Sequence, residues 1–372
     1  MPYLSCNLPK YPCESDMWDS LKCERRPIVV YGMGNGADKL IRRLSEYGVE
    51  IADFFASDGF VRGHSFHGKR VKTFSEIKET YPDFLILLSF ATNREEVIDM
   101  LLRIDGEYDM LVPDMPVVGE EYFDREFFNK NYEKICSAYE LLADEDSKRA
   151  YASIINYRLS GKMSYLLGAY SEKADVYSLI SREMSVKGYI DAGAYNGDTV
   201  REAVEYFPSL RRVYAIEPDA RNYKKLSAYA NTVSKPSVTA INAAAWCESR
   251  TGSFNSSGNR NSSVSGASFE HKALTVDLVR IDSLTDSGVD LIKYDVEGAE
   301  MEALIGSEGI IEKSHPALIV SLYHMSRDIF ALPLYLSKKY AGYKLYLRRT
   351  KCLPAWEIDL VLVPNVDKTQ SM

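Results

Sequence analysis

A glycine-rich turn between a strand and a helix, GYIDAGAYNGDTVREAV at residues 188–204, sets the fold class of this chain. Its apolar start predicts a buried strand, and Thr199 to Glu202 have the Thr-x-x-Glu form that caps the start of a helix. Glycines in such a turn allow a ligand to approach the backbone closely at the carboxyl end of the strand. The stretch therefore predicts a ligand-binding strand–turn–helix unit of an α/β fold.

Strands and helices alternate along most of the chain, a pattern typical of parallel sheets. After the turn, strands are predicted at Val213 to Glu217, Val238 to Ala244, Leu291 to Asp295, Ala317 to Tyr323, Tyr343 to Leu347 and Ile358 to Val363. With 372 residues, the chain exceeds one typical domain. We expect an N-terminal extension (1–25), a smaller Rossmann-like domain of nucleotide-binding type (26–125), a helical connector (126–186) and the main α/β domain (187–366).

Composition limits the classes of partner. The net charge of −8 and the ordinary apolar and charged fractions, 46% and 26%, predict a folded protein that does not bind nucleic acid. No apolar run is long enough for a membrane helix, and no secretory signal is visible at the start. The six cysteines are scattered without a C-x-x-C pair, which favours reduced thiols, a cytoplasmic location and no zinc.

Two acids at strand ends select the ligand of the glycine turn. Asp191 lies at the mouth of the turn, where it would repel the pyrophosphate of a dinucleotide but attract a positively charged amino group. Glu217 ends the next strand, 24 residues beyond Gly193, and can accept both hydroxyls of a ribose. S-adenosylmethionine carries both groups and is the predicted cofactor. The alternatives are a capping role for Asp191 and a plain surface acid at Glu217.

A second group of acids, Asp295, Glu297 and Glu300, follows a buried strand, and helix capping explains only one of them. We predict that Asp295 is a proton acceptor whose pKa the two neighbouring acids raise, with Lys293 pointing away from it. His324, at the tip of the next strand, is the second catalytic candidate, as a base or as a group that orients the acceptor. These residues could also bind Mg²⁺ or Mn²⁺, but no spacing dictates it, and no metal is predicted.

Four ordered segments, at residues 189–199, 214–219, 241–245 and 290–300, together resemble the FkbM family of S-adenosylmethionine-dependent methyltransferases. The string KYDVEGAE at 293–300 is similar to the most specific signature of that family. The resemblance implies a class I methyltransferase domain over 187–366, with a mostly parallel seven-stranded sheet whose last strand is antiparallel. It also implies O-methylation of a hydroxylated, carbohydrate-like acceptor. The predicted cofactor-binding residues are Asp191, Gly193, Ala194, Gly197, Glu217 and Pro218.

The front domain carries GMGNGA at residues 32–37, a weak dinucleotide fingerprint, and Asp58 could bind a ribose hydroxyl. The same glycines could instead serve tight strand–helix packing with no ligand. An NAD(P)- or sugar-nucleotide-dependent enzyme and a non-catalytic nucleotide sensor therefore stay open as alternative functions.

The connector has polar faces that suggest a solvated linker, a lid or a dimer surface. We expect it to shape the acceptor pocket together with the Ser-rich loop at 252–268. Homo-oligomerisation is left open.

Overall fold

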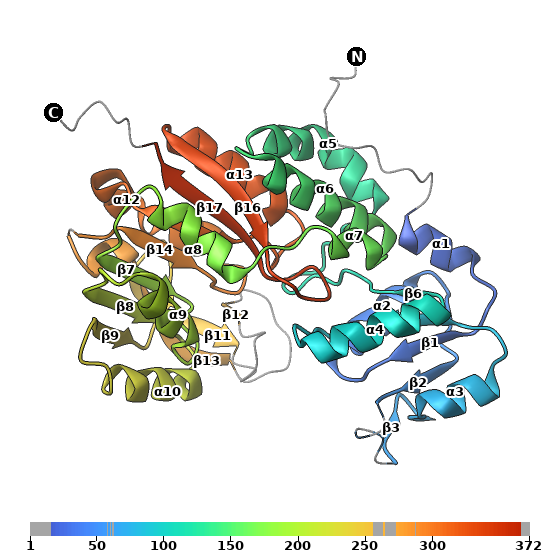
Figure 1. The fold of residues 1–372 in the computed structure, drawn as a ribbon. Helices are drawn as coiled ribbons and strands as arrows, with labels where there is room; N and C mark the ends of the chain where they lie inside the picture. Colours follow the sequence, from blue (N-terminus) through green and yellow to red (C-terminus); the bar gives the residue numbers. More distant parts are fainter. Residues whose placement is uncertain are drawn as a thin grey trace.

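The computed structural model describes residues 16–57, 59, 61, 63–255, 263–264, 273–286 and 288–365. A parallel sheet and a larger, mostly parallel sheet lie side by side, each with its own helices, and a group of helices in the middle of the chain lies over the larger sheet (Figure 1). None of the helices in these described ranges is both long and apolar enough to cross a lipid bilayer.

The larger sheet has seven strands in the order β16-β17-β15-β14-β7-β8-β9. Their bounds are β7 (Gly188–Ala192), β8 (Arg212–Ile216), β9 (Ser237–Ile241), β14 (Leu291–Tyr294), β15 (Ala317–Ser321), β16 (Tyr343–Arg349) and β17 (Ile358–Pro364). Only β17 runs antiparallel to its neighbours, β15 and β16. This arrangement confirms the predicted mostly parallel seven-stranded sheet with an antiparallel last strand.

Both faces of the larger sheet are buried at its central strands β7, β14 and β15, which explains why these strands are mostly apolar. In β7, Tyr189 belongs to one hydrophobic cluster and Ile190 to another, and Leu291 and Ile292 of β14 alternate in the same way. The helices of this half are α9 (Asp198–Tyr206), α10 (Ala220–Ala230), α11 (Glu300–Ile305), α12 (Glu308–Ser314) and α13 (Asp328–Lys339).

The smaller sheet, β2-β1-β5-β6, is parallel throughout, as expected for a second α/β unit ahead of the main one. Its elements are β1 (Ile28–Tyr31), α2 (Asn35–Glu46), β2 (Asp53–Phe55), β3 (Ser65–Phe66), β4 (Lys69–Arg70), α3 (Phe74–Thr80), β5 (Leu85–Leu88), α4 (Glu95–Glu107) and β6 (Met110–Leu111). A Cβ added at Gly36 would lie 2.0 Å from the carbonyl oxygen of Ser89. Close packing of α2 against the end of β5 therefore requires this glycine without any ligand.

The interpretation of the connector as a solvated linker is wrong. Its helices are α5 (Arg125–Glu140), α6 (Glu145–Ser160), α7 (Ser164–Leu167) and α8 (Lys173–Ser181), and α6 packs on β16 while α5 packs on α13. Tyr151, Ile154 and Tyr157 of α6 are completely buried in the main core. Even a charged residue of this helix is internal, because Arg158 Nε lies 3.0 Å from a carboxylate oxygen of the buried Asp114. The connector is thus part of the folded core.

A small extra sheet was not predicted. It has the order β10-β13-β11-β12, with β10 (Ala244–Ala245), β11 (Arg250–Asn255), β12 (Ser263–Val264) and β13 (Ala273–Val279). The start of the Ser-rich stretch is therefore strand β11, although most of the loop at 252–268 lies outside the described residues. At the other end of the chain, α1 (Met17–Cys23) buries Met17, Trp18 and Leu21 against the front unit.

Candidate functional site

A cleft of about 360 Å³ lies at the carboxyl ends of β7, β8, β14 and β15. It brings together four residues predicted from the sequence, namely Gly193, Glu217, Pro218 and Asp295. Asp191, Ala194, Gly197 and His324 are not among its lining residues; Asp191, Ala194 and His324 have no exposed surface. These residues lie behind the cleft surface, where they can act only through neighbours or after local adjustment.

The glycine turn after β7 packs directly on the end of β14. Gly193 has a positive φ of 92°, and a Cβ added there would lie 1.8 Å from the carbonyl oxygen of Asp295. Backbone amides of Gly193 and Ala194 both donate to the carbonyl of Ile216, at 3.0 and 2.9 Å. Only glycine fits at position 193, and its absence of a side chain joins the turn and the tip of β14 into one wall of the cleft.

Asp191 lies beneath this turn. The Thr199 hydroxyl donates a hydrogen bond to its Oδ2, and Lys293 is its partner residue across the β7–β14 register. Burial raises the pKa of Asp191 to about 6, and the positive charge of Lys293 partly opposes that rise. Asp191 therefore provides negative potential under the turn at neutral pH.

Glu217 is buried, with 7% of its surface exposed, so the interpretation of it as a surface acid is wrong. Its Oε1 accepts from the backbone amide of Asp219 and its Oε2 from that of Tyr195, each at 2.9 Å. Burial raises the pKa of Glu217 to about 7, although these two amides favour the ionised form. The carboxylate is thus held in one orientation at the edge of the cleft.

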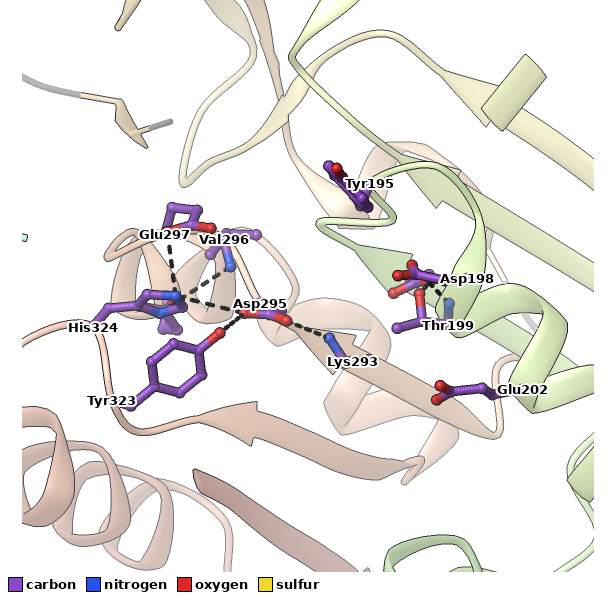
Figure 2. A network of polar contacts seen from close by, with 12 residues as sticks. Tyr195, Asp198, Thr199, Glu202, Lys293, Asp295, Val296, Glu297, Tyr323 and His324 are labelled. Atoms are coloured by element: carbon purple, nitrogen blue, oxygen red, sulfur yellow. Dashed lines mark hydrogen bonds and ion pairs between the residues drawn. The ribbon is translucent and has the colours of Figure 1, made fainter. Parts of the chain in front are cut away.

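Asp295 is held from two sides, as Figure 2 shows. Lys293 Nζ lies 2.8 Å from Oδ2, and the Tyr323 hydroxyl donates to Oδ1 at 3.1 Å. Burial alone would raise the pKa of Asp295, but the positive charges of Lys293 and His324 outweigh burial and hold this pKa well below its ordinary range. The expectation of a raised pKa is therefore wrong. The physical reason is strand geometry, because residues 293 and 295 are two apart and point to the same face.

His324 is completely buried among three carboxyl groups, and Figure 2 shows two of them, those of Asp295 and Glu297. Its Nδ1 lies 2.9 Å from Glu300, and its Nε2 lies 3.5 Å from Glu297 and 3.6 Å from Asp295. Burial alone would lower the pKa of His324, but Glu300 and the other two acids raise it to about 10. A protonated imidazole does not accept a proton, so this geometry favours the orienting role over that of a base.

Glu297 lines the cleft beside Asp295, whereas the sequence predicts it only as a neighbour that raises the pKa of Asp295. Burial raises its pKa to about 8, against the attraction of His324. Its Oε2 is buried and has no hydrogen-bond partner within the described part of the chain. Glu297 is thus an acid that is mostly protonated at neutral pH and lines the cleft.

Other lining residues were missed altogether. Tyr323 could have been found, because it precedes His324 at a strand tip, but Trp356, Asn93 and Val117 come from distant loops without any local signal. The connector also contributes, since Lys173 and others at the start of α8 line the cleft. Among the described residues, no group of three or more His, Cys, Asp or Glu side chains is arranged to hold a metal ion.

The chain has the fold of a class I methyltransferase, as shown by the order of its strands, its glycine turn and the acids at its strand tips. Residues 191–345 match the model of the methyltransferase FkbM domain, so this part of the chain is an FkbM methyltransferase domain, as its sequence predicted.

The chain is similar in structure to methyltransferase FkbM from Methylobacillus flagellatus KT, with a TM-score of 0.70 over 92% of each chain. At 19% identity this similarity is one of fold, and it extends over the front unit as well. An rRNA methylase from Streptococcus thermophilus (TM-score 0.33, 14% identity, 51% of this chain and 91% of that one) matches more weakly. A precorrin-6y C5,15-methyltransferase from Geobacter metallireducens GS-15 is comparable (TM-score 0.32, 14% identity, 52% and 91%), and neither bears on function. No curated protein sequence matches significantly.

Proposed function

We propose that this chain is an S-adenosylmethionine-dependent O-methyltransferase that acts on a hydroxylated, carbohydrate-like acceptor. The observation that carries the proposal is the packing of Gly193 on the carbonyl of Asp295. Because this contact joins the turn to the tip of β14, a cofactor on the turn and an acceptor at Asp295 would share one cleft.

The residues present fit the cofactor. Glu217 faces the cleft as a fixed carboxylate suited to two ribose hydroxyls, and Asp191 supplies negative potential for a positively charged amino group. The volume of about 360 Å³ is in the range of small-molecule sites. When bound there, S-adenosylmethionine supplies an electrophilic methyl group.

On the acceptor side, Asp295 is the group that receives the hydroxyl. Lys293 and Tyr323 fix its two oxygens and keep it ionised, so it accepts a hydrogen bond from the acceptor and orients the oxygen for attack. A carboxylate with a low pKa is a weak base, but an alcohol oxygen becomes strongly acidic as it gains a methyl group. Asp295 therefore takes the proton late, as the new C–O bond forms. His324 is a positioning residue that balances the charge of the acids around it.

The rest of the cleft favours a hydroxylated acceptor. Lys173, Glu202, Glu357 and Asp359 all line it, and such groups form hydrogen bonds with the many hydroxyls of a saccharide. Incubation of the full chain with S-adenosylmethionine and a panel of simple sugars, read as S-adenosylhomocysteine formed and as methyl ether product, tests this function. Absence of a methyl ether product with every sugar of the panel would contradict it.

No observation favours the front unit as the catalytic one. Gly32 and Gly36 pack on Ser89, which explains two of the three fingerprint glycines without a ligand, and Asp58 lies outside the described residues. The proposal therefore gives the chemistry to the C-terminal domain, and a cytoplasmic location and homo-oligomer formation stay predictions from sequence.

A further inference from the structure

A second cavity, of about 210 Å³, lies between the front unit and the methyltransferase domain. It opens at the carboxyl ends of β1 and β5 and is closed by the segment 112–117 and by the loop before β17. Its lining is predominantly apolar and includes Met33, Leu40, Phe90, Val112, Met115 and Trp356.

The second cavity adjoins the catalytic cleft. Val117 and Trp356 line both of them, so the two spaces border each other at these two residues. The segment of Val117 is held by the front unit, because Lys39 Nζ donates to the carbonyls of Pro116 and Val117 at 2.7 and 3.0 Å. The backbone amide of Val118 donates to the carbonyl of His324 at 2.9 Å. The front unit thereby builds part of the wall beside the acid cluster.

Trp356 connects the second cavity to the reacting end of the cleft. Its ring stacks on Tyr323, with centroids 6.4 Å apart, and the Tyr323 hydroxyl in turn contacts Asp295. The loop that carries Trp356 is fixed to the front unit by reciprocal backbone hydrogen bonds between Thr92 and Leu353, at 2.7 and 2.9 Å.

We propose that the second cavity is an acceptor subsite that binds the apolar part of an amphipathic acceptor, whose hydroxyl lies at Asp295. This inference rests on the proposed methyltransferase function and adds the chemical class of the acceptor. The two spaces differ in character, because charged groups line the catalytic cleft while apolar side chains line most of the second cavity. A molecule with a hydroxylated head and an alkyl or aryl tail matches both, whereas a bare sugar leaves the apolar surface uncovered. The front unit is then an element of acceptor selection.

Calorimetry on the full chain saturated with S-adenosylhomocysteine tests the subsite, with methyl β-D-glucoside and n-hexyl β-D-glucoside as probes below any micelle concentration. We expect the hexyl glucoside to bind at least about tenfold more tightly, because burial of its extra methylene groups is favourable. Met115→Asp places a charge in the half-buried apolar lining and should remove this advantage without changing the affinity for S-adenosylhomocysteine. Ala91→Trp, at the exposed rim of the cavity, should remove it by filling space.

Met184→Asp is the matched control, since Met184 is also half-buried but lines neither cavity, and it should keep the advantage of the hexyl glucoside. The inference is overturned if the hexyl glucoside binds no better than the methyl glucoside in the unaltered chain, including the case in which neither binds. It is also overturned if Met115→Asp and Ala91→Trp both leave the advantage intact. Failure of the proposed function would be seen separately, as a lack of S-adenosylhomocysteine binding by the unaltered chain.

Discussion

Lys293 Nζ lies 2.8 Å from Asp295 Oδ2, and this contact decides the chemical character of the site. Lys293 is buried, and its charge is the main force that keeps Asp295 ionised against burial. Asp295 is therefore a permanent carboxylate that orients a hydroxyl and takes its proton late, and it does not titrate in the neutral range.

Asp295→Asn should lower turnover by about 10²-fold or more, because the amide keeps the shape but cannot take the proton. S-adenosylhomocysteine binding, measured by calorimetry, should be unchanged. The variant removes the nearest counter-charge of the buried Lys293, so its melting temperature should fall.

The double variant Lys293→Met with Asp295→Asn separates these two effects. It should recover melting temperature relative to Asp295→Asn alone, while turnover stays low. Normal turnover in the folded single variant would show that Asp295 is not the proton acceptor.

Glu297 should destabilise the folded chain at alkaline pH. Its folded pKa is about 8 against an ordinary 4.5, so between these values the folded state holds a proton that the unfolded state has lost. The contribution of Glu297 to the free energy of unfolding therefore falls as the pH rises from 4.5 to 8. Glu297→Gln should raise the free energy of unfolding at pH 8.5 by about 1–2 kcal/mol relative to the unaltered chain, and by less at pH 5.

Thermal or denaturant unfolding at the two pH values measures this difference. Glu312→Gln, at an exposed position of α12, is the control and should show no comparable gain. An equal effect of Glu297→Gln at both pH values would show that burial does not hold the proton on Glu297.

Cofactor affinity should depend on pH through the two acids near the glycine turn. Burial raises the pKa of Asp191 to about 6 and that of Glu217 to about 7, and the ionised forms are the ones that attract the amino group and accept the ribose hydroxyls. The affinity for S-adenosylhomocysteine should therefore increase about tenfold from pH 5.5 to pH 8. Glu217→Gln should remove much of this dependence, and a flat profile in the unaltered chain would contradict the assignment.

Local patterns in the sequence were enough to predict the seven-stranded sheet, the turn at Gly193 and the acid at Glu217. Each of these features lies in a short segment, and the spacing of its apolar residues and the end of its strand are visible in the sequence itself. The direction of the Lys293 side chain can also be predicted from the sequence, because residues 293 and 295 are two apart and therefore point to the same face of the strand. The prediction that Lys293 points away from Asp295 compares Lys293 with Tyr294 instead.

Features formed by distant segments could not be predicted. The Asn93 and Val117 contributions to the cleft depend on how the front unit packs against the loop of Trp356, which no local pattern encodes. The burial of α6 was missed because its charged residues suggested a solvated face, whereas Arg158 is neutralised internally by Asp114.

Calorimetry of the full chain against S-adenosylhomocysteine measures whether the C-terminal domain binds the cofactor through Glu217. The unaltered chain should bind, and Glu217→Ala should weaken binding by about 1.4–3 kcal/mol, the scale of a lost pair of charge-assisted hydrogen bonds. Glu205→Ala, at an exposed position of α9, should leave the affinity unchanged. No binding by the unaltered chain, or equal affinity in a folded Glu217→Ala variant, would show that Glu217 does not hold the cofactor.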